Sequence, residues 1–328
     1  MNLPTIDWKK LLKFLGPLLF VLFFIKVVDP YKTANLLKNI NPGWVLLSMA
    51  FFPVLVYLRA FRWWMISRKI ELKVPLKRLF QIYYIAWFLG NLPVGGISAV
   101  SKFFYLKDEG IAASRAFISL SLDKLFDIGG LVLLGLYALC YLPTSLVAAR
   151  IPWIFIITTA LLLIFGLAFG KKIWLASKRL LGRYLNKKFQ RIGNSLEDDL
   201  KLFWSTAGLT FWVKITALSV GIGILRSLVM LIIAHSIGIS ASFPFMIACT
   251  GLIGLANIIP ISIHGLGVRD AILLLTLPLI GYSKEAALAL GLAMFLWTIL
   301  FKLSGIYYWF KSPLPLKGID GIKHKFFS

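Results

Sequence analysis

Apolar segments recur along the whole of this 328-residue chain and restrict it to folds that a lipid bilayer can solvate. Because about 20 apolar helical residues cross the hydrocarbon core, each long uninterrupted segment is a candidate transmembrane helix. The hydrophobic fraction of 59% and mean hydropathy of +0.84 exclude a soluble globular domain. The sequence therefore predicts an all-α polytopic membrane protein. Segments of sufficient length fall at about 11–28, 43–66, 115–142, 151–170, 211–236 and 284–310.

Two further apolar blocks, at about 79–110 and 243–282, are interrupted by turn-forming, polar and charged residues. Irregular backbone at membrane depth persists only where protein or a water-filled cavity covers it. Paired broken segments are typical of transporter binding sites, so we expect two re-entrant helical hairpins, although two full spans per block also fit hydropathy. The interrupting residues are Asn91, Pro93, Gly95, Gly96 and Lys102 in the first block, and Asn257, Pro260, Ser262, Gly265, Gly267, Arg269 and Asp270 in the second.

Basic residues are distributed unevenly around the apolar segments and account for the net charge of +23. Positive-inside reasoning places both termini and the loops at 67–78 and 171–201 in the cytoplasm. Membrane topology and anionic lipids explain this charge better than nucleic acid does. The stretch 171–205 mixes basic and apolar residues, as in an amphipathic segment on lipid headgroups, with a solvated loop as the alternative.

Six spans and two hairpins give the single domain, 1–328, an internal symmetry. Span, span, hairpin and span occur over about 11–142 and again, in the opposite orientation, over about 151–310. This order predicts an inverted repeat, which is common in secondary transporters. Arg59 and Arg226 occupy comparable spans in the two halves.

The second hairpin contains the elements of an anion site. Gly265 and Gly267 permit tight backbone geometry, and a new helix is expected to begin near Val268. Its first N–H groups carry partial positive charge, and the guanidinium of Arg269 can hold a phosphate with two hydrogen bonds. Asp270 is expected to orient Arg269; the alternative is a sharp turn with an internal Arg–Asp pair. In the first hairpin, Gly95, Gly96 and Lys102 offer a similar site, or Lys102 reaches the interface as a snorkelling side chain.

Asp123 and Asp127 are four residues apart in the segment 115–142 and share a helix face, with Lys124 beside them. They lie roughly 12 and 18 Å along the helix from Arg115, a depth at which charges require partners or water. They therefore line a charged cavity or belong to an interhelical ion-pair network. The candidate partners are Arg59, Arg62, Arg226 and Lys302.

The sequence gives little support for cysteine, metal or nucleotide chemistry. Cys140 and Cys249 lie within apolar stretches, and His235 and His264 are too separated to indicate a metal. No Walker-type or dinucleotide motif occurs, so we expect no cofactor and no ATP-driven pump.

The interrupted motifs resemble those of a known family. Residues 260–270, PISIHGLGVRD, resemble the Pro-x-Ser-x-Gly-Gly-x-Gly-x-Arg-Glu signature of the lysylphosphatidylglycerol synthase transmembrane, or flippase-like, family, which includes the membrane part of the bacterial multiple peptide resistance factor. Residues 93–96 with Lys102 are similar to its earlier Pro-Gly-rich motif, and residues 123–127 resemble its Glu-Arg-Leu-x-Asp element. This chain has His264 in place of a Gly, Asp270 in place of Glu and Lys102 in place of Arg.

The resemblance implies a stand-alone member, without the soluble aminoacyl-transferase domain, that moves a phospholipid or polyprenyl-linked lipid between leaflets of the cytoplasmic membrane. We expect Arg269 and Lys102 to hold an anionic headgroup. The partners are then membrane lipids with phosphate-bearing headgroups, and a homo-oligomer is compatible with this interpretation. The alternatives are an enzyme or enzyme subunit acting on lipid-linked sugars through Asp123 and Asp127, or a non-transporting scaffold for lipid synthesis. The headgroup path is expected to include Asp123, Asp127, Lys124, Arg226 and Asp270.

Overall fold

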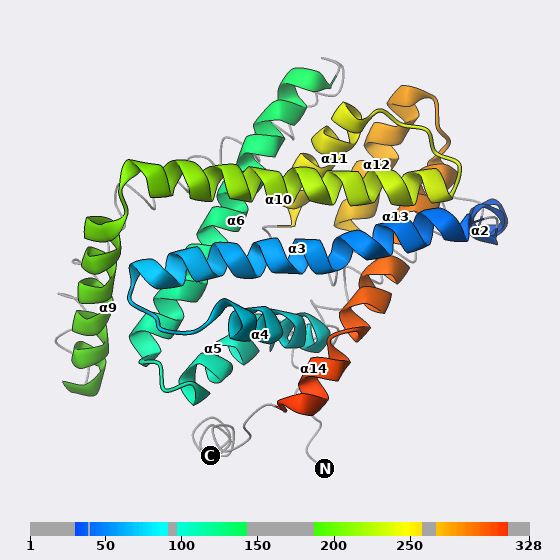
Figure 1. Cartoon of the computed structure of the whole chain (residues 1–328). Helices are drawn as coiled ribbons and strands as arrows, with labels where there is room; N and C mark the ends of the chain where they lie inside the picture. The colour runs from blue at the N-terminus through cyan, green and yellow to red at the C-terminus, as the bar shows by residue number, and fades with distance from the viewer. Residues whose placement is uncertain (1–29, 39, 91–96, 143–186, 258–266, 314–328) are drawn as a thin grey trace, which may run out of the picture. The chain divides into compact units, whose positions relative to one another are not determined.

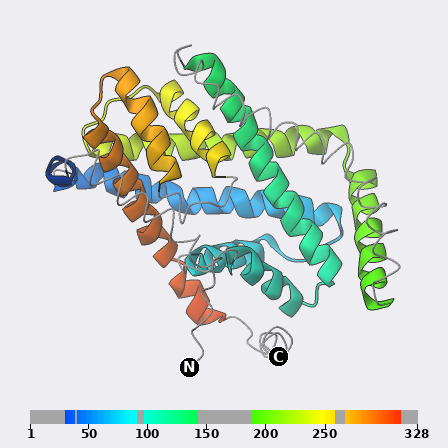
Figure 2. The same cartoon turned by 180° about the vertical axis from the view of Figure 1, so that it is seen from behind.

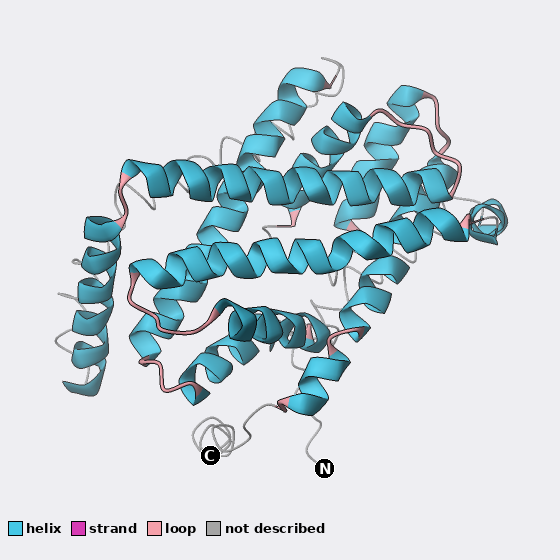
Figure 3. Cartoon of the chain, in the orientation of Figure 1, coloured by secondary structure: helices cyan, strands magenta, loops and turns pink. Residues whose placement is uncertain are grey.

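The computed structural model describes residues 30–38, 40–90, 97–142, 187–257 and 267–313, and within these ranges the regular structure is helical, with no strand (Figures 1 and 3). This confirms the predicted all-α class. The elements are α2 (Pro30–Lys38), α3 (Pro42–Lys69), α4 (Leu76–Leu89), α5 (Ile97–Asp108), α6 (Ala113–Tyr141), α9 (Lys187–Thr206), α10 (Leu209–Ser236), α11 (Phe243–Ala256), α12 (Val268–Thr276), the 3₁₀ helix η1 (Leu277–Ile280), α13 (Lys284–Leu303) and α14 (Ile306–Lys311).

Three of the described helical segments are long and apolar enough to cross a bilayer. They are α3, α10 and the run Lys284–Lys311, which contains α13 and α14. They coincide with the predicted spans at 43–66, 211–236 and 284–310. The predicted span at 115–142 forms α6, whereas 11–28 and 151–170 lie outside the described residues. The total number of spanning and re-entrant helices stays a prediction.

The helices of both interrupted blocks end where the sequence predicts a break. α4 is 14 residues long and ends at Gly90, and α11 is also 14 residues long and ends at Asn257. At 1.5 Å per residue each is about 21 Å long, shorter than the roughly 30 Å hydrocarbon core. The chain resumes with α5 at Ile97 and with α12 at Val268. In both views α5 lies beside α4 and α12 lies beside α11 (Figures 1 and 2).

The chain divides into two compact units. Unit 1 comprises the described residues within Met1–Phe52, Leu131–Ile157 and Gly223–Leu300, and unit 2 those within Pro53–Gly130, Thr158–Ile222 and Phe301–Ser328. The division cuts through the long helices α3, α6 and α10, so each unit takes segments from both halves of the chain. The two predicted repeats, 11–142 and 151–310, divide the chain differently from these two units. The inverted repeat stays a prediction.

Within unit 1, α11 packs closely against the backbone of α6. A Cβ atom at Gly251 of α11 would lie 2.5 Å from the backbone carbonyl of Leu134 on α6. Any other residue would therefore push the two helices apart. Small residues at helix interfaces are the usual way in which membrane helices approach closely.

In unit 2, α9 is attached to the start of α6 by a buried carboxylate. The Ser114 hydroxyl donates to Asp199 Oδ2 at 2.8 Å, and Arg115 Nε donates to Asp199 Oδ1 at 3.1 Å. At the C-terminal end of α9, Lys69 Nζ donates to the Thr206 carbonyl at 2.6 Å. The described part of the segment predicted to be amphipathic, 171–205, is thus a helix held by contacts at Asp199 and Thr206, both in its C-terminal half; its position at a membrane surface stays a prediction.

Candidate functional site

A buried charged cluster lies at the centre of unit 2. Arg62 on α3 donates from Nε to Asp123 Oδ1 at 2.9 Å, and its two terminal nitrogens lie 3.4 Å from Asp127 Oδ1. Arg62 is only 1% exposed. Its NH1 also reaches the Ser219 hydroxyl on α10 at 3.5 Å. The arginine therefore joins three helices through one planar group.

A second arginine, Arg59, lies one helical turn from Arg62 and shares the same carboxylate. Its NH2 is 3.6 Å from Asp127 Oδ1, and its guanidinium carbon lies 5.1 Å from the ring centre of Trp87 on α4. Arg59 Nε is buried and has no hydrogen-bond partner among the described residues. A buried donor without an acceptor costs about 1–3 kcal/mol, so this atom is available to an additional acceptor.

Lys102 completes the cluster from α5. The residue is 8% exposed, and its Nζ lies 3.3 Å from the ring centre of Tyr83 and 5.3 Å from that of Trp63. No described carboxylate lies within 4.0 Å of this amine, although both aspartates and both arginines are within electrostatic range. A snorkelling lysine exposes its amine, whereas this amine is covered by aromatic rings.

Among the described residues, the formal charges of this cluster of Arg59, Arg62, Lys102, Asp123 and Asp127 do not cancel when Lys102 is protonated. Arg59, Arg62 and Lys102 contribute three positive charges, and Asp123 and Asp127 contribute two negative ones. The excess is one positive charge in a largely dehydrated environment, where a charge without a counterion is costly. The geometry therefore suits the binding of an anion.

Unit 1 contains the other predicted anion site, at the start of α12. Gly267 has φ of 91°, a conformation that suits glycine, and α12 begins at the next residue, as predicted. The Gly267 N–H donates to Asp270 Oδ2 at 2.9 Å. Arg269 donates from Nε and NH2 to Asp270 Oδ1 at 3.2 and 3.1 Å. Asp270 thus orients both the turn and the arginine and partly neutralises the guanidinium, an arrangement that the alternative of a sharp turn with an internal Arg–Asp pair also predicts.

A glycine on α13 makes room for this arrangement. A Cβ atom at Gly291 would lie 2.0 Å from Asp270 Oδ1. Asp270 itself is 1% exposed. The carboxylate is therefore held between the α12 backbone and the α13 surface.

The remaining predicted residues are placed as follows. Asn257 is the exposed C-terminal cap of α11, and Arg226 is half-buried on the unit 1 part of α10. Asn91, Gly95, Gly96, Ser262 and Gly265 lie outside the described residues. Unit 2 thus brings together Lys102, Asp123, Asp127 and Lys124, and unit 1 contains Arg226, Asn257, Gly267, Arg269 and Asp270.

The structure selects among the partners proposed for the two aspartates. Arg59 and Arg62 pair with them, whereas Lys302, in the same unit, pairs with neither. The aromatic environment of Lys102 was not predicted. Its two rings, Trp63 and Tyr83, lie on different helices, and in the sequence each is indistinguishable from an ordinary packing residue. Within the part of the chain that the structure describes, no group of three or more His, Cys, Asp or Glu side chains is arranged to hold a metal ion.

Comparison with known proteins assigns most of this sequence to one family. The profile of the lysylphosphatidylglycerol synthase TM region matches residues 11–303. Similar proteins include a UPF0104 membrane protein of Methanocaldococcus jannaschii, 19% identical over 294 residues that cover 84% of this chain and 86% of the relative. Another is a UPF0104 membrane protein of Methanothermobacter thermautotrophicus, 22% identical over 289 residues that cover 81% of this chain and 84% of the relative. With its helical spans and its interrupted motifs, this chain belongs to the lysylphosphatidylglycerol synthase transmembrane-region family.

Proposed function

We propose that this protein is a lipid flippase, or lipid transporter, of the cytoplasmic membrane. Its cargo is an anionic or modified phospholipid, or a polyprenyl-linked lipid, with a phosphate-bearing headgroup. The observation that carries the proposal is the buried cationic excess of Arg59, Arg62 and Lys102 over Asp123 and Asp127 in a membrane protein.

The charge balance favours a binding role over a purely structural one. A structural ion-pair network is most stable when its charges are matched, since each unmatched charge retains its desolvation cost. Here the amine of Lys102 faces aromatic rings, and Arg59 Nε has no acceptor among the described residues. A phosphate group bound in the cluster would supply negative charge and hydrogen-bond acceptors.

The turn at Gly267 supplies a second anion-binding element. The N-terminus of α12 carries partial positive charge, and Arg269 lies in its first turn. Because Asp270 already accepts two hydrogen bonds from Arg269, we assign the tighter headgroup contact to the Lys102 cluster. In this scheme Arg269 and the turn bind the headgroup at another stage of its passage.

Helix lengths support the proposed inverted repeat. α3 and α10 are each 28 residues long, and each is followed by a 14-residue helix, α4 and α11. Each short helix precedes an interruption and a second short helix. In transporters built from such repeats, the broken helices lie near the substrate.

Burial of the carboxylates argues against the enzymatic alternative. A general acid or base must reach the reacting atoms. Asp123 is 5% exposed and hydrogen-bonded to Arg62, and Asp127 is shared by both arginines. These contacts suit a fixed electrostatic role better than proton transfer.

The test is lipid exchange by the full chain in proteoliposomes. Fluorescent anionic, cationic and polyprenyl-phosphate lipids are followed by protection from a membrane-impermeant quencher. We expect exchange of one phosphate-bearing anionic class and at least a tenfold slower rate in Lys102→Met, because a charge-assisted contact is worth about 1.5–3 kcal/mol. Lys102→Arg should retain exchange. A folded protein that exchanges none of these lipids would overturn the proposal.

Arg269→Ala separates the two proposed anion sites. If Arg269 binds the headgroup during passage, this variant should also slow exchange while leaving equilibrium binding of the anionic lipid to the Lys102 cluster within about twofold, an interaction difference of roughly 0.4 kcal/mol. Unchanged exchange in Arg269→Ala, together with slow exchange in Lys102→Met, would restrict the headgroup site to unit 2.

A further inference from the structure

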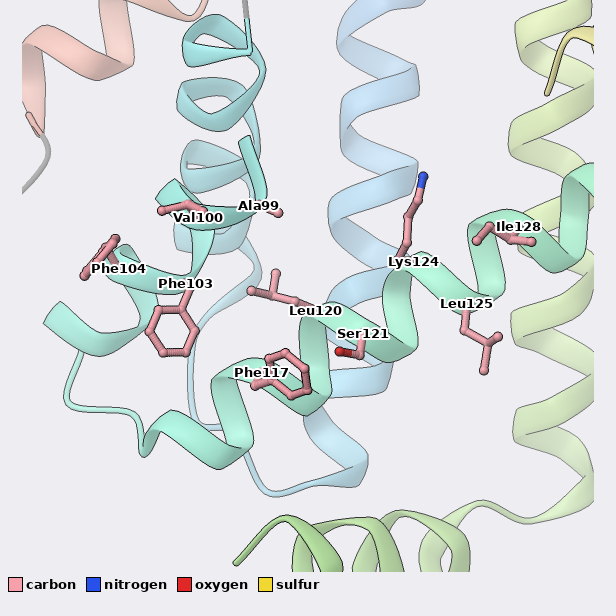
Figure 4. A pocket seen from close by; sticks show the side chains of 10 residues that line it. All are labelled: Ala99, Val100, Phe103, Phe104, Phe117, Leu120, Ser121, Lys124, Leu125 and Ile128. Carbon is pink, nitrogen blue, oxygen red and sulfur yellow. The ribbon is translucent and has the colours of Figure 1, made fainter. Parts of the chain in front are cut away.

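A groove runs between α5 and α6 within unit 2 and has a volume of about 770 Å³. This volume lies in the range of about 300–1,000 Å³ that is usual for ligand sites. Its walls are almost entirely apolar. The main contributors are Val100, Phe103 and Phe104 from α5 and Phe117, Leu120 and Leu125 from α6 (Figure 4).

The two faces of α5 separate this groove from the charged cluster. At about 100° per residue, Val100 and Phe104 lie roughly 160° around the helix from Lys102. Accordingly Lys102 is buried against Tyr83 and Trp63, whereas Val100 is 51% exposed and lines the groove. A single short helix therefore has a cationic face toward the cluster and an apolar face toward the groove.

Lys124 connects the groove to the cluster along α6. Phe117, Leu120, Lys124 and Ile128 follow one another at spacings of three and four residues, so they form one stripe on the helix. The Lys124 side chain is 67% exposed, and its Nζ lies 4.0 Å from Asp127 Oδ2, at the outer limit for an ion pair. Asp127 is already paired with Arg59 and Arg62. The amine of Lys124 is therefore weakly held and is the one charged group among the residues that line this groove.

We propose that this groove binds one hydrocarbon chain of an anionic lipid, with the lipid phosphate held by Lys124 at the edge of the cluster. This inference rests on the proposed transport function, because it assigns a binding site to the hydrocarbon tail of the transported lipid. Phe117 lies seven residues from Lys124, or about 10 Å along α6, so a chain anchored at Lys124 passes Leu120 and reaches Phe117. The excess positive charge of the cluster selects an anionic headgroup, and the aromatic and aliphatic walls accept the chain.

The groove thus specifies the cargo as a lipid whose phosphate and first chain segment are recognised together. Free phosphate, or a lipid headgroup without its hydrocarbon chain, makes no contacts with the apolar walls of the groove. A neutral lipid with the same chain lacks the contact with Lys124. Both parts are required for retention in the groove.

The test is photo-cross-linking of the full chain in phosphatidylcholine vesicles. One probe is phosphatidylglycerol with a diazirine in the middle of one acyl chain; the other is diacylglycerol with the same modified chain. Cross-linked peptides are mapped by mass spectrometry. We expect phosphatidylglycerol to label the α6 peptide that contains Phe117 and Leu120 at least fivefold more than diacylglycerol does.

Three variants locate the contacts. Leu120→Trp fills the groove and should reduce labelling at least fivefold, and Lys124→Gln should reduce phosphatidylglycerol labelling to the diacylglycerol level. The matched control is Val213→Trp, which enlarges an exposed apolar side chain of α10 in the same unit, outside the groove, and should leave labelling unchanged.

Two outcomes would overturn the inference. Equal labelling by both probes, unaffected by Lys124→Gln, would make the groove an ordinary lipid-facing surface. Absence of labelling in the folded protein would mean that a segment of this chain covers it. Measuring lipid exchange in the same vesicles separates the two proposals: exchange without groove labelling refutes only the tail site, and specific labelling without exchange refutes only transport.

Discussion

At the scale of single residues, three buried cations differ in how far their charge is balanced by a neighbouring carboxylate. Arg62 is paired with two aspartates and Arg269 with its neighbour Asp270, whereas Lys102 contacts aromatic rings and has no carboxylate of the described residues within 4.0 Å. A planar guanidinium is suited to bidentate pairing, whereas an ammonium is a compact charge that an aromatic ring can cover. Arg62 and Arg269 are therefore largely neutralised by carboxylates, whereas the ammonium group of Lys102 is available to an anion.

Removing Arg62 should destabilise the protein strongly. Arg62→Met keeps the approximate length of the side chain but leaves Asp123 buried without its charged partner, at a cost of about 3–5 kcal/mol. We expect loss of that much unfolding free energy in a reversible denaturant titration in detergent. Lys124→Met, which removes an exposed cation at the edge of the cluster, is the control and should change stability by less than about 1 kcal/mol. Equal effects of the two substitutions would contradict the proposed role of Arg62.

At the scale of elements, short helices are positioned by contacts that tolerate no additional atom. The start of α12 is held through Asp270, whose carboxylate touches the surface of α13 at Gly291. The helix α11 is held against α6 at Gly251. Interrupted helices have few hydrogen bonds of their own at their ends, so such contacts determine where their termini point.

Gly291→Ala tests the contact between α13 and the α12 turn. The added methyl group overlaps Asp270 Oδ1, so the carboxylate must move and its bonds to Gly267 and Arg269 weaken. We expect destabilisation by about 1–3 kcal/mol and a loss of lipid exchange comparable to that of Arg269→Ala. Gly221→Ala on α10, where an added methyl group meets nothing within 4 Å, is the control. Normal exchange in Gly291→Ala would show that the turn tolerates displacement of Asp270.

Gly251→Ala tests the packing of α11 on α6. The new methyl group would lie 2.5 Å from the Leu134 backbone, which cannot rotate away as a side chain can. We expect a loss of about 1–3 kcal/mol of stability, measured by thermal denaturation in detergent at a fixed lipid content. Gly129→Ala, in open space on α6, should have no such effect. A neutral result at Gly251 would contradict the close helix contact.

At the scale of the whole molecule, positive-inside reasoning makes a topology prediction that labelling can check. In a Cys140→Ser, Cys249→Ser background, a cysteine at Lys73 and one at Lys311 should react with a membrane-impermeant maleimide from the cytoplasmic side. A cysteine at Ser240, in the uncharged connection 237–242, should react from the other side. Permeabilised vesicles give the reference for full reactivity. Labelling of all three positions from one side would contradict the proposed arrangement of spans and hairpins.

Local features of the sequence predicted the all-α membrane class, three of the long spans and the breaks after α4 and α11, because hydropathy, proline and glycine act locally along the chain. The start of α12 and the pairing of Arg269 with Asp270 were predictable for the same reason: the groups are close in sequence. Which cations pair with Asp123 and Asp127 depends instead on tertiary packing, since Arg62 is 61 residues from the first aspartate and 65 from the second. That choice depends on how packed helices are rotated about their own axes. The aromatic cover of Lys102 and the groove beside Lys124 likewise exist only once α3, α4, α5 and α6 have packed together.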